Sequence, residues 1–134
     1  MQGYYLDTAI WIDYYQMRGS RGKAALKFMK SAIRKDDMIA YSDQVIKELR
    51  QLGYSPEIIN NMFSIAKPDH LIRIHAYPEE IEEAIRISRK RGLPKGDVIH
   101  AILARDNYLQ FVTRDQHFAQ LKDISDAKRP ENLF

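Results

Sequence analysis

The chain has 134 residues, 45% of them hydrophobic, which is enough for one ordinary hydrophobic core but not for two. Lysine and arginine exceed aspartate and glutamate by 21 − 18 = 3, so the charge permits a polyanionic partner without requiring one. The absence of cysteine excludes disulfides, zinc–thiolate sites and thiol catalysis. We therefore expect a single domain over residues 1–134, with no linker, internal repeat or low-complexity tract.

Short apolar runs alternate along the chain with segments whose apolar residues recur at helical spacing. The runs predict strands at residues 4–6, 38–41, 71–74 and 109–112. Helices are predicted to begin at or beside Ala9, Gly22, Ser42, Pro56, Pro78 and Asp97, with a short last helix around 118–121. This alternation predicts an α/β fold, in which right-handed crossovers join parallel strands and helices cover both faces of the sheet. In open sheets of this kind, ligands bind beyond the carboxyl ends of the strands.

The N-terminal segment has no basic leader followed by an apolar stretch, and nowhere do 18 apolar residues run together. We therefore expect a soluble, cytoplasmic protein that does not enter a membrane. Trp11 lies between Ile10 and Ile12, so we expect it in the core rather than on a base-stacking surface.

Four acidic residues lie at the edges of apolar runs, namely Asp7, Glu48, Asp97 and Asp115. A carboxylate beside a hydrophobic core is costly unless a positive or hydrogen-bonding group accompanies it, and a shared site for divalent cations would explain all four. Clusters of oxygen ligands select hard cations such as Mg²⁺ or Mn²⁺. Such cations can activate water for phosphodiester hydrolysis, so the pattern predicts a metal-dependent enzyme that hydrolyses a nucleic-acid backbone.

Each of these acids also has a structural interpretation. Asp7 and Asp97 are suited to cap helices, Asp115 to cap the short helix after it, and Glu48 to be a solvated residue at the edge of an apolar face. If all four are structural, the alternative function is an RNA-binding module with weak or no catalytic activity.

The four histidines, His70, His75, His100 and His117, offer a second alternative. Histidines and a lysine can cleave RNA without metal by transferring protons, although these histidines are scattered along the sequence. His100 lies three residues after Asp97 and is the one closest in sequence to an acid of the set.

A basic stretch, Arg86, Arg89, Lys90, Arg91 and Lys95, leads into Asp97. Such residues can bind phosphates on either side of a scissile bond. They are equally suited to a solvated helix end whose dipole they complement, and both interpretations stay open.

In order and spacing, the motifs resemble the PIN domain, a nuclease family that supplies the toxin of many prokaryotic VapC-type toxin–antitoxin pairs. The resemblance rests on Tyr5-Leu6-Asp7-Thr8 with Ile10-Trp11-Ile12-Asp13 after it, on Ser42 and Val45-Ile46-Lys47-Glu48-Leu49, on the segments 96–104 and 111–118, and on the closing 129–133. It implies a Mg²⁺- or Mn²⁺-dependent endoribonuclease with a three-layer α/β/α fold and a central, mostly parallel sheet of four or five strands. Carried over residue by residue, the catalytic and metal-binding set would be Asp7, Glu48, Asp97 and Asp115, supported by the polar residues Thr8, Ser42 and Thr113.

The resemblance also implies an RNA substrate, a homodimer and, in toxin–antitoxin pairs, an antitoxin protein that blocks the acidic cleft. The family includes RNA-processing nucleases too, so the toxin role does not follow from the four acids alone. The segment 53–91 matches no family motif. Together with the possible RNA-binding residues Arg89, Lys90, Arg91 and Lys95, we expect it to influence which RNA is cut.

Overall fold

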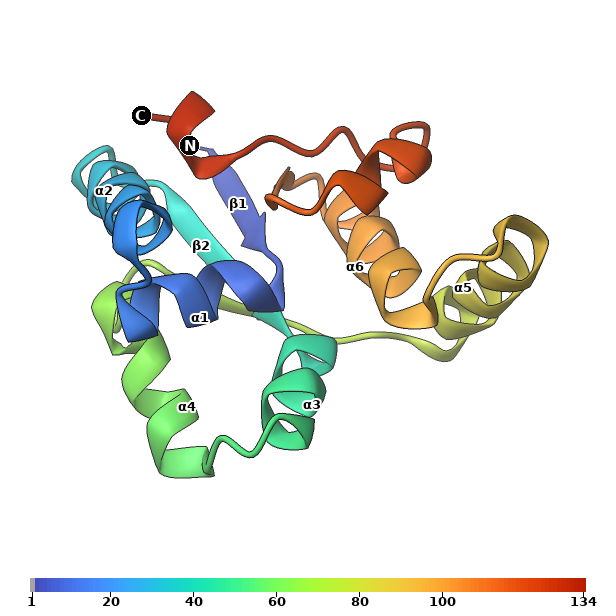
Figure 1. The fold of residues 1–134 in the computed structure, drawn as a ribbon, viewed down its shortest axis with the longest axis horizontal. Coiled ribbons are helices and arrows are strands. Elements are labelled where there is room, and N and C mark those ends of the chain that lie inside the picture. Colours follow the sequence, from blue (N-terminus) through green and yellow to red (C-terminus); the bar gives the residue numbers. More distant parts are fainter. Residues whose placement is uncertain (1) are drawn as a thin grey trace.

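The computed structural model describes residues 2–134, in which a four-stranded sheet lies between layers of helices (Figure 1). The strands are β1 (Gly3–Leu6), β2 (Met38–Ser42), β3 (Leu71–Ile74) and β4 (Gln110–Val112). Their order is β3-β2-β1-β4 and every neighbouring pair is parallel, so the predicted α/β fold with four strands is confirmed. The central strand β1 places Tyr5 beside Ala40 of β2 and Phe111 of β4.

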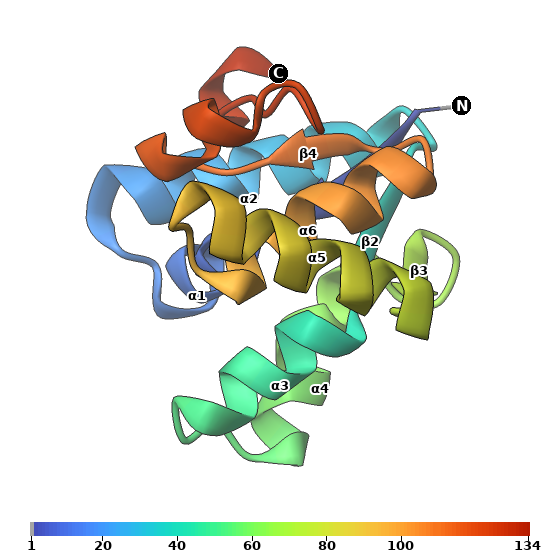
Figure 2. The same cartoon turned by 90° about the vertical axis from the view of Figure 1, so that its right-hand side faces the viewer.

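In the described part of the chain, six α-helices cover this sheet. They are α1 (Thr8–Gln16), α2 (Gly19–Arg34), α3 (Asp43–Gln51), α4 (Pro56–Phe63), α5 (Pro78–Arg91) and α6 (Lys95–Asp106), with shorter 3₁₀ turns η1 (Ser64–Ala66), η2 (Gln116–Leu121) and η3 (Pro130–Asn132). In Figure 1, α1 and α2 lie on one side of the strands and α5 and α6 on the other. Figure 2 shows α3 and α4 projecting together from the rest of the molecule. Within residues 2–134, no helix has both the length and the apolar composition that crossing a bilayer requires.

The core forms where the central strand meets the helices on both of its faces. Tyr5 and Leu6 are completely buried, as expected for a strand in the middle of a parallel sheet. Trp11 is also completely buried and packs edge-on against Phe63, with ring centroids 4.7 Å apart, which confirms its predicted place in the core. Helix α6 is buried continuously from Val98 to Ala104, so it is an internal helix, as its almost wholly apolar sequence predicts.

Helix α6 begins two residues earlier than the sequence predicts. Pro94 occupies the N-cap position, because a proline ring is tolerated only at the start of a helix, and Lys95 is the first helical residue. Asp97 is therefore the third residue of α6, and the interpretation of Asp97 as a helix cap is wrong. Its carboxylate is free for another role.

The junction of α1 and α2 is tighter than the sequence suggests, since α2 begins at Gly19 rather than near Gly22. Met17 and Gly19 both adopt left-handed backbone conformations, with φ of 48° and 54°. A Cβ at Gly22 would lie 2.6 Å from the Met17 backbone, so the glycine lets the first turn of α2 pack directly on the end of α1.

Candidate active site

A cleft of about 350 Å³ lies at the carboxyl end of the central strand, and all four predicted acidic residues line it. Asp7 follows β1, Asp115 follows β4, Glu48 lies on α3 and Asp97 lies on α6. We call this hollow the acidic cleft; its lining residues are Asp7, Thr8, Ala9, Ile12, Glu48, Gln51, Leu52, Asp97, His100, Asp115 and Phe118. The parallel topology thus gathers acids from four separate segments at the edge of the sheet where ligands are expected.

Asp7 is both a helix cap and a lining residue of the acidic cleft. Its Oδ1 accepts a hydrogen bond from the Ile10 backbone N–H at 3.1 Å, and its Oδ2 accepts one from the Thr113 hydroxyl. Thr113 Oγ1 in turn accepts from the Asp115 N–H at 3.1 Å, so it links the two acids. Burial raises the pKa of Asp7 to about 6, although the Thr113 hydrogen bond and His100 oppose this shift.

The surroundings of Glu48 shift its pKa in the opposite direction from that of Asp7. Its Oε1 accepts hydrogen bonds from Thr8 Oγ1 at 2.5 Å and His100 Nε2 at 2.9 Å, and its Oε2 accepts one from Gln44 Nε2 at 2.8 Å. Burial alone would raise the pKa of Glu48, but the bonds from His100, Thr8 and Gln44 outweigh it and lower the pKa to about 2. Glu48 is therefore not a freely solvated edge residue, and it stays ionised at physiological pH.

A chain of buried hydrogen bonds holds His100 against Glu48. His100 Nδ1 lies 2.7 Å from the Tyr5 hydroxyl, which lies 2.6 Å from Ser42 Oγ. Because Nε2 must donate to the Glu48 carboxylate, Nδ1 of a neutral ring accepts from Tyr5, and Tyr5 then accepts from Ser42. Ser42 also caps α3 by accepting a hydrogen bond from the Val45 N–H at 3.3 Å. This serine is completely buried, so it supports Glu48 only through Tyr5 and His100.

Gly96 makes room for this arrangement. A Cβ added at Gly96 would lie 2.7 Å from Glu48 Oε2 and 3.1 Å from Gln44 Nε2. The absence of a side chain therefore allows the Glu48–Gln44 pair to pack directly against the start of α6, beside Asp97.

Asp97 and Asp115 form the part of the site best suited to a cation. Each offers a carboxylate oxygen, and these atoms and a ring nitrogen of His117 all lie within 4.8 Å of one another. Burial raises the pKa of Asp97, and the nearby charges of Asp115 and Glu48 raise it further. A divalent cation would relieve this repulsion, so the donor set fits a metal ion. Asp7 and Glu48 line the same cleft but are not members of this tight group.

Several contacts in the site were not foreseen in the sequence. Gln44 lies four residues before Glu48 on α3, a spacing that puts both side chains on one helix face and was the available signal. His117 lies two residues after Asp115, but the sequence suggests it only for metal-free chemistry. Tyr5 belongs to the strand predicted at 4–6, and no local pattern indicates its hydrogen bond to His100.

The histidines are poorly placed for metal-free cleavage. His70 pairs with Asp36 and His75 with Asp43, outside the acidic cleft, while His100 lines the cleft but is buried with both ring nitrogens engaged. His117, beside Asp97 and Asp115, is then the one histidine in the described residues that can face a substrate there, whereas that mechanism uses two.

None of the predicted RNA-binding residues Arg89, Lys90, Arg91 and Lys95 lines the acidic cleft. Arg91 forms a two-point ion pair with Asp123, at 2.9 and 2.8 Å. RNA binding by these residues stays a prediction.

Replacing Tyr5 by phenylalanine is expected to lower the free energy of unfolding by about 1–3 kcal/mol, because inside the core it leaves His100 Nδ1 without a partner and the Ser42 hydroxyl without an acceptor for its proton. Urea denaturation measures this loss. Tyr108 is 92% exposed, so Tyr108→Phe is a matched control that should change stability by less than about 0.5 kcal/mol. Equal, small effects of the two substitutions would show that the buried chain is not stabilising.

The comparisons with known proteins agree with this geometry. The family model of the PIN domain matches residues 4–124, and the chain therefore belongs to the PIN domain family. PIN domains are generally nucleases. No curated protein matches the sequence.

Solved structures share the fold over nearly the whole chain. The crystal structure of VapBC2 from Rickettsia felis bound to a DNA fragment from their promoter is 18% identical, covers 96% of this chain and 98% of that one, and has a TM-score of 0.71. VapBC-1 from nontypeable Haemophilus influenzae is 16% identical with the same coverages and a TM-score of 0.67. A toxin–antitoxin complex from Klebsiella pneumoniae is 19% identical, covers 94% and 96%, and has a TM-score of 0.62. At these identities the likeness establishes the fold.

Proposed function

We propose that this protein is a divalent-cation-dependent ribonuclease that hydrolyses RNA phosphodiester bonds in the acidic cleft. One observation carries the proposal: Asp7, Glu48, Asp97 and Asp115, from four separate segments, line the same cleft of a PIN domain. Within it, donor atoms of Asp97, Asp115 and His117 lie within 4.8 Å of one another. A packed core does not require such a concentration of carboxylates, whereas a cation site does.

The chain's own residues have distinct roles in this proposal. Asp97 and Asp115 hold the cation, with His117 beside them and Asp7 facing the same cleft. When bound, Mg²⁺ or Mn²⁺ would activate water and neutralise the charge that builds on the phosphate oxygens. Glu48 contributes fixed negative charge and orientation rather than proton transfer, because a carboxylate with a pKa near 2 is a poor base at neutral pH.

Protonation of Asp7 and binding of a cation in the cleft oppose each other. Burial favours the protonated form of Asp7, whereas a positive charge in the cleft favours the ionised form. Thr113 holds Asp7 and Asp115 in a fixed relation through its hydroxyl, so the two acids are placed before the cation arrives.

Incubating the protein with mixed-sequence single-stranded RNA is expected to give cleavage with Mn²⁺ or Mg²⁺ and none in EDTA. Because water attacks the phosphorus, the products should carry no 2′,3′-cyclic phosphate. RNA binding that survives EDTA, with no cleavage under either metal, would instead support the RNA-binding module. Cleavage in EDTA with cyclic phosphate ends would support the histidine mechanism.

A toxin role is the narrower form of this proposal. The solved structures named above include VapBC proteins and a toxin–antitoxin complex, which supports looking for an antitoxin partner and a homodimer here. Growth arrest on expression, absent when Asp97 is replaced by asparagine, would separate a toxin from an RNA-processing nuclease.

A further inference from the structure

A second hollow, of about 510 Å³, adjoins the acidic cleft along the junction of α1 and α2. The two hollows share Ala9 and Asp115, so they are continuous at one of the proposed cation ligands. Three arginines line the second hollow. We call it the arginine groove and define it by Asp13, Arg18, Arg21, Arg114, Asp115 and His117.

Two of these arginines are held in place by a buried acid. Asp13 is only 3% exposed, and its carboxylate oxygens lie 3.6 Å from Arg18 Nη1 and 3.9 Å from Arg114 Nε. Arg18 remains half-exposed, so Asp13 holds its guanidinium on one side while the other side is open to the groove. Arg114 also forms a two-point ion pair with Glu131 at the C-terminal end of the chain.

Arg21 is the uncompensated charge of the groove. It is exposed on the first turn of α2, and within residues 2–134 no acidic group lies within ion-pair distance of its guanidinium. Close packing at Gly22 fixes this turn against the end of α1. Arg21 therefore presents a positive charge from a rigid element next to the acidic cleft.

The charges of the groove suit a chain of phosphates once a cation is bound. Three guanidinium groups meet three carboxylates, those of Asp13, Asp115 and Glu131, and a cation on Asp115 would leave the groove with an excess of positive charge, centred on Arg21. Guanidinium groups bind phosphate oxygens with two parallel hydrogen bonds, so a groove lined by three arginines suits a nucleic-acid backbone. Because the groove meets the cleft at Asp115, one strand can occupy both.

We propose that the arginine groove binds the RNA phosphates that directly neighbour the scissile one, with Arg21 and Arg18 as the contacting residues. The identity of the reacting phosphate rests on the proposed function, whereas the binding of neighbouring phosphates rests on the groove itself. The RNA strand thus leaves the acidic cleft over the α1–α2 junction, not over the basic end of α5.

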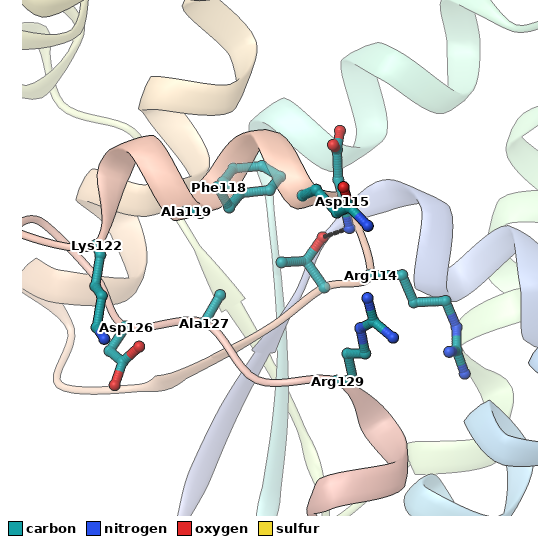
Figure 3. A pocket seen from close by; sticks show the side chains of 10 residues that line it. Arg114, Asp115, Phe118, Ala119, Lys122, Asp126, Ala127 and Arg129 are labelled. Atoms are coloured by element: carbon teal, nitrogen blue, oxygen red, sulfur yellow. Dashed lines mark hydrogen bonds between the residues drawn. The ribbon is translucent and has the colours of Figure 1, made fainter.

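A third hollow offers a different route and is less suitable. It lies between η2 and the C-terminal segment, and Arg114 and Arg129 stand at one end of it (Figure 3). Figure 3 shows Lys122 beside Asp126 at the other end, with the apolar Phe118, Ala119 and Ala127 between. Asp115 and Arg114 line this hollow as well, but apolar side chains separate its arginines from Lys122, and Asp126 lies beside that lysine, so its positive charges are interrupted.

The test is binding of fluorescein-labelled mixed-sequence single-stranded RNA, followed by anisotropy in an Asp97→Asn background with Mg²⁺ over a range of salt concentrations. Arg21→Gln is expected to weaken binding about fivefold at 0.1 M salt and to lower the salt slope by about 0.7, the effect of one lost phosphate contact on a single strand. Lys30→Gln removes the same charge from an exposed position nine residues further along α2 and should leave the slope unchanged. Melting curves verify that each variant is folded.

The outcomes separate this inference from the proposed function. If Arg129→Gln lowers the slope and Arg21→Gln does not, the RNA follows the hollow of Figure 3 and the inference is wrong. Equal effects of Arg21→Gln and Lys30→Gln would show that only the net charge of the protein affects RNA binding, and the inference would again be wrong. Binding that depends on Arg21, in a wild-type protein that cleaves no RNA under either metal, would uphold the groove while refuting the nuclease.

Discussion

Asp97→Asn is expected to reduce Mg²⁺- or Mn²⁺-dependent RNA cleavage by more than about 100-fold, because even the loss of a residue that only supports a metal ligand costs about 10- to 100-fold. Asparagine keeps the shape of the side chain and one oxygen but removes the charge that holds the cation. The fold should survive, since burial and Asp115 already disfavour the ionised form of Asp97. Cleavage rates with and without Mn²⁺, together with a melting curve, measure both effects.

The matched control for this variant is Asp69→Asn, an identical chemical change at an exposed position in the turn before β3. It should leave the cleavage rate and its metal dependence unchanged. If Asp97→Asn retained metal-dependent activity close to that of Asp69→Asn, Asp97 would not be a ligand, and the assignment of the site would have to be abandoned.

Asp7→Asn is expected to stabilise the metal-free protein at pH 7 by about 1–3 kcal/mol. A carboxyl with an ordinary pKa of 3.8 when unfolded and about 6 when folded binds its proton more tightly in the folded state. The folded state therefore bears a cost that is absent below about pH 4, grows as the pH rises from 4 to 6, and is complete above 6, at about 1.4 kcal/mol per unit of pKa difference. Asparagine is neutral at every pH and avoids this cost, less the loss of one hydrogen bond.

Urea unfolding of the metal-free wild type and the Asp7→Asn variant between pH 4.5 and 8 measures this difference. The stability gap between them should widen as the pH rises and close as it falls. Glu48 acts with the opposite sign, because its lowered pKa adds stability that is lost only as the pH falls from about 4.5 toward 2. A gap that stays constant across the range would show that Asp7 is not strained by burial.

The elements of this fold that depend on local signals were predictable from the sequence. The strands at 4–6, 38–41 and 71–74 and the cap of α3 at Ser42 agree with the structure, because apolar runs and capping hydrogen bonds involve residues close in sequence. The predicted start of α6 at Asp97 is wrong: an aspartate suits a helix cap, but Pro94 occupies the N-cap position and Lys95 is the first helical residue.

The acids were predictable as a set, but their individual environments were not. Glu48 and Asp7 look alike in the sequence, yet their pKa values move in opposite directions. The difference comes from partners distant in the chain: Thr8 and His100 both donate to Glu48, whereas Asp7 receives one hydroxyl, from Thr113. Only tertiary packing brings these groups together, so no local sequence pattern predicts these hydrogen bonds.

The arginine groove illustrates the same limit. The sequence draws attention to a basic stretch at the end of α5, whereas the groove joins Arg18 and Arg21, at the junction of α1 and α2, to Arg114, which follows β4 far along the chain. Asp13, the acid that holds two of these arginines, ends the motif Ile10-Trp11-Ile12-Asp13, but nothing in that motif indicates its arginine partners. Positive charges that act together need to be neighbours in space, not in sequence.

The most direct test of the shared cation site is a crystal of the wild-type protein soaked in Mn²⁺ and measured at a wavelength where manganese scatters anomalously. We predict an anomalous peak in the acidic cleft, about 2.1 Å from carboxylate oxygens of Asp97 and Asp115. A protein that binds no Mn²⁺ in the cleft, or binds it only at a position remote from both aspartates, would contradict the account.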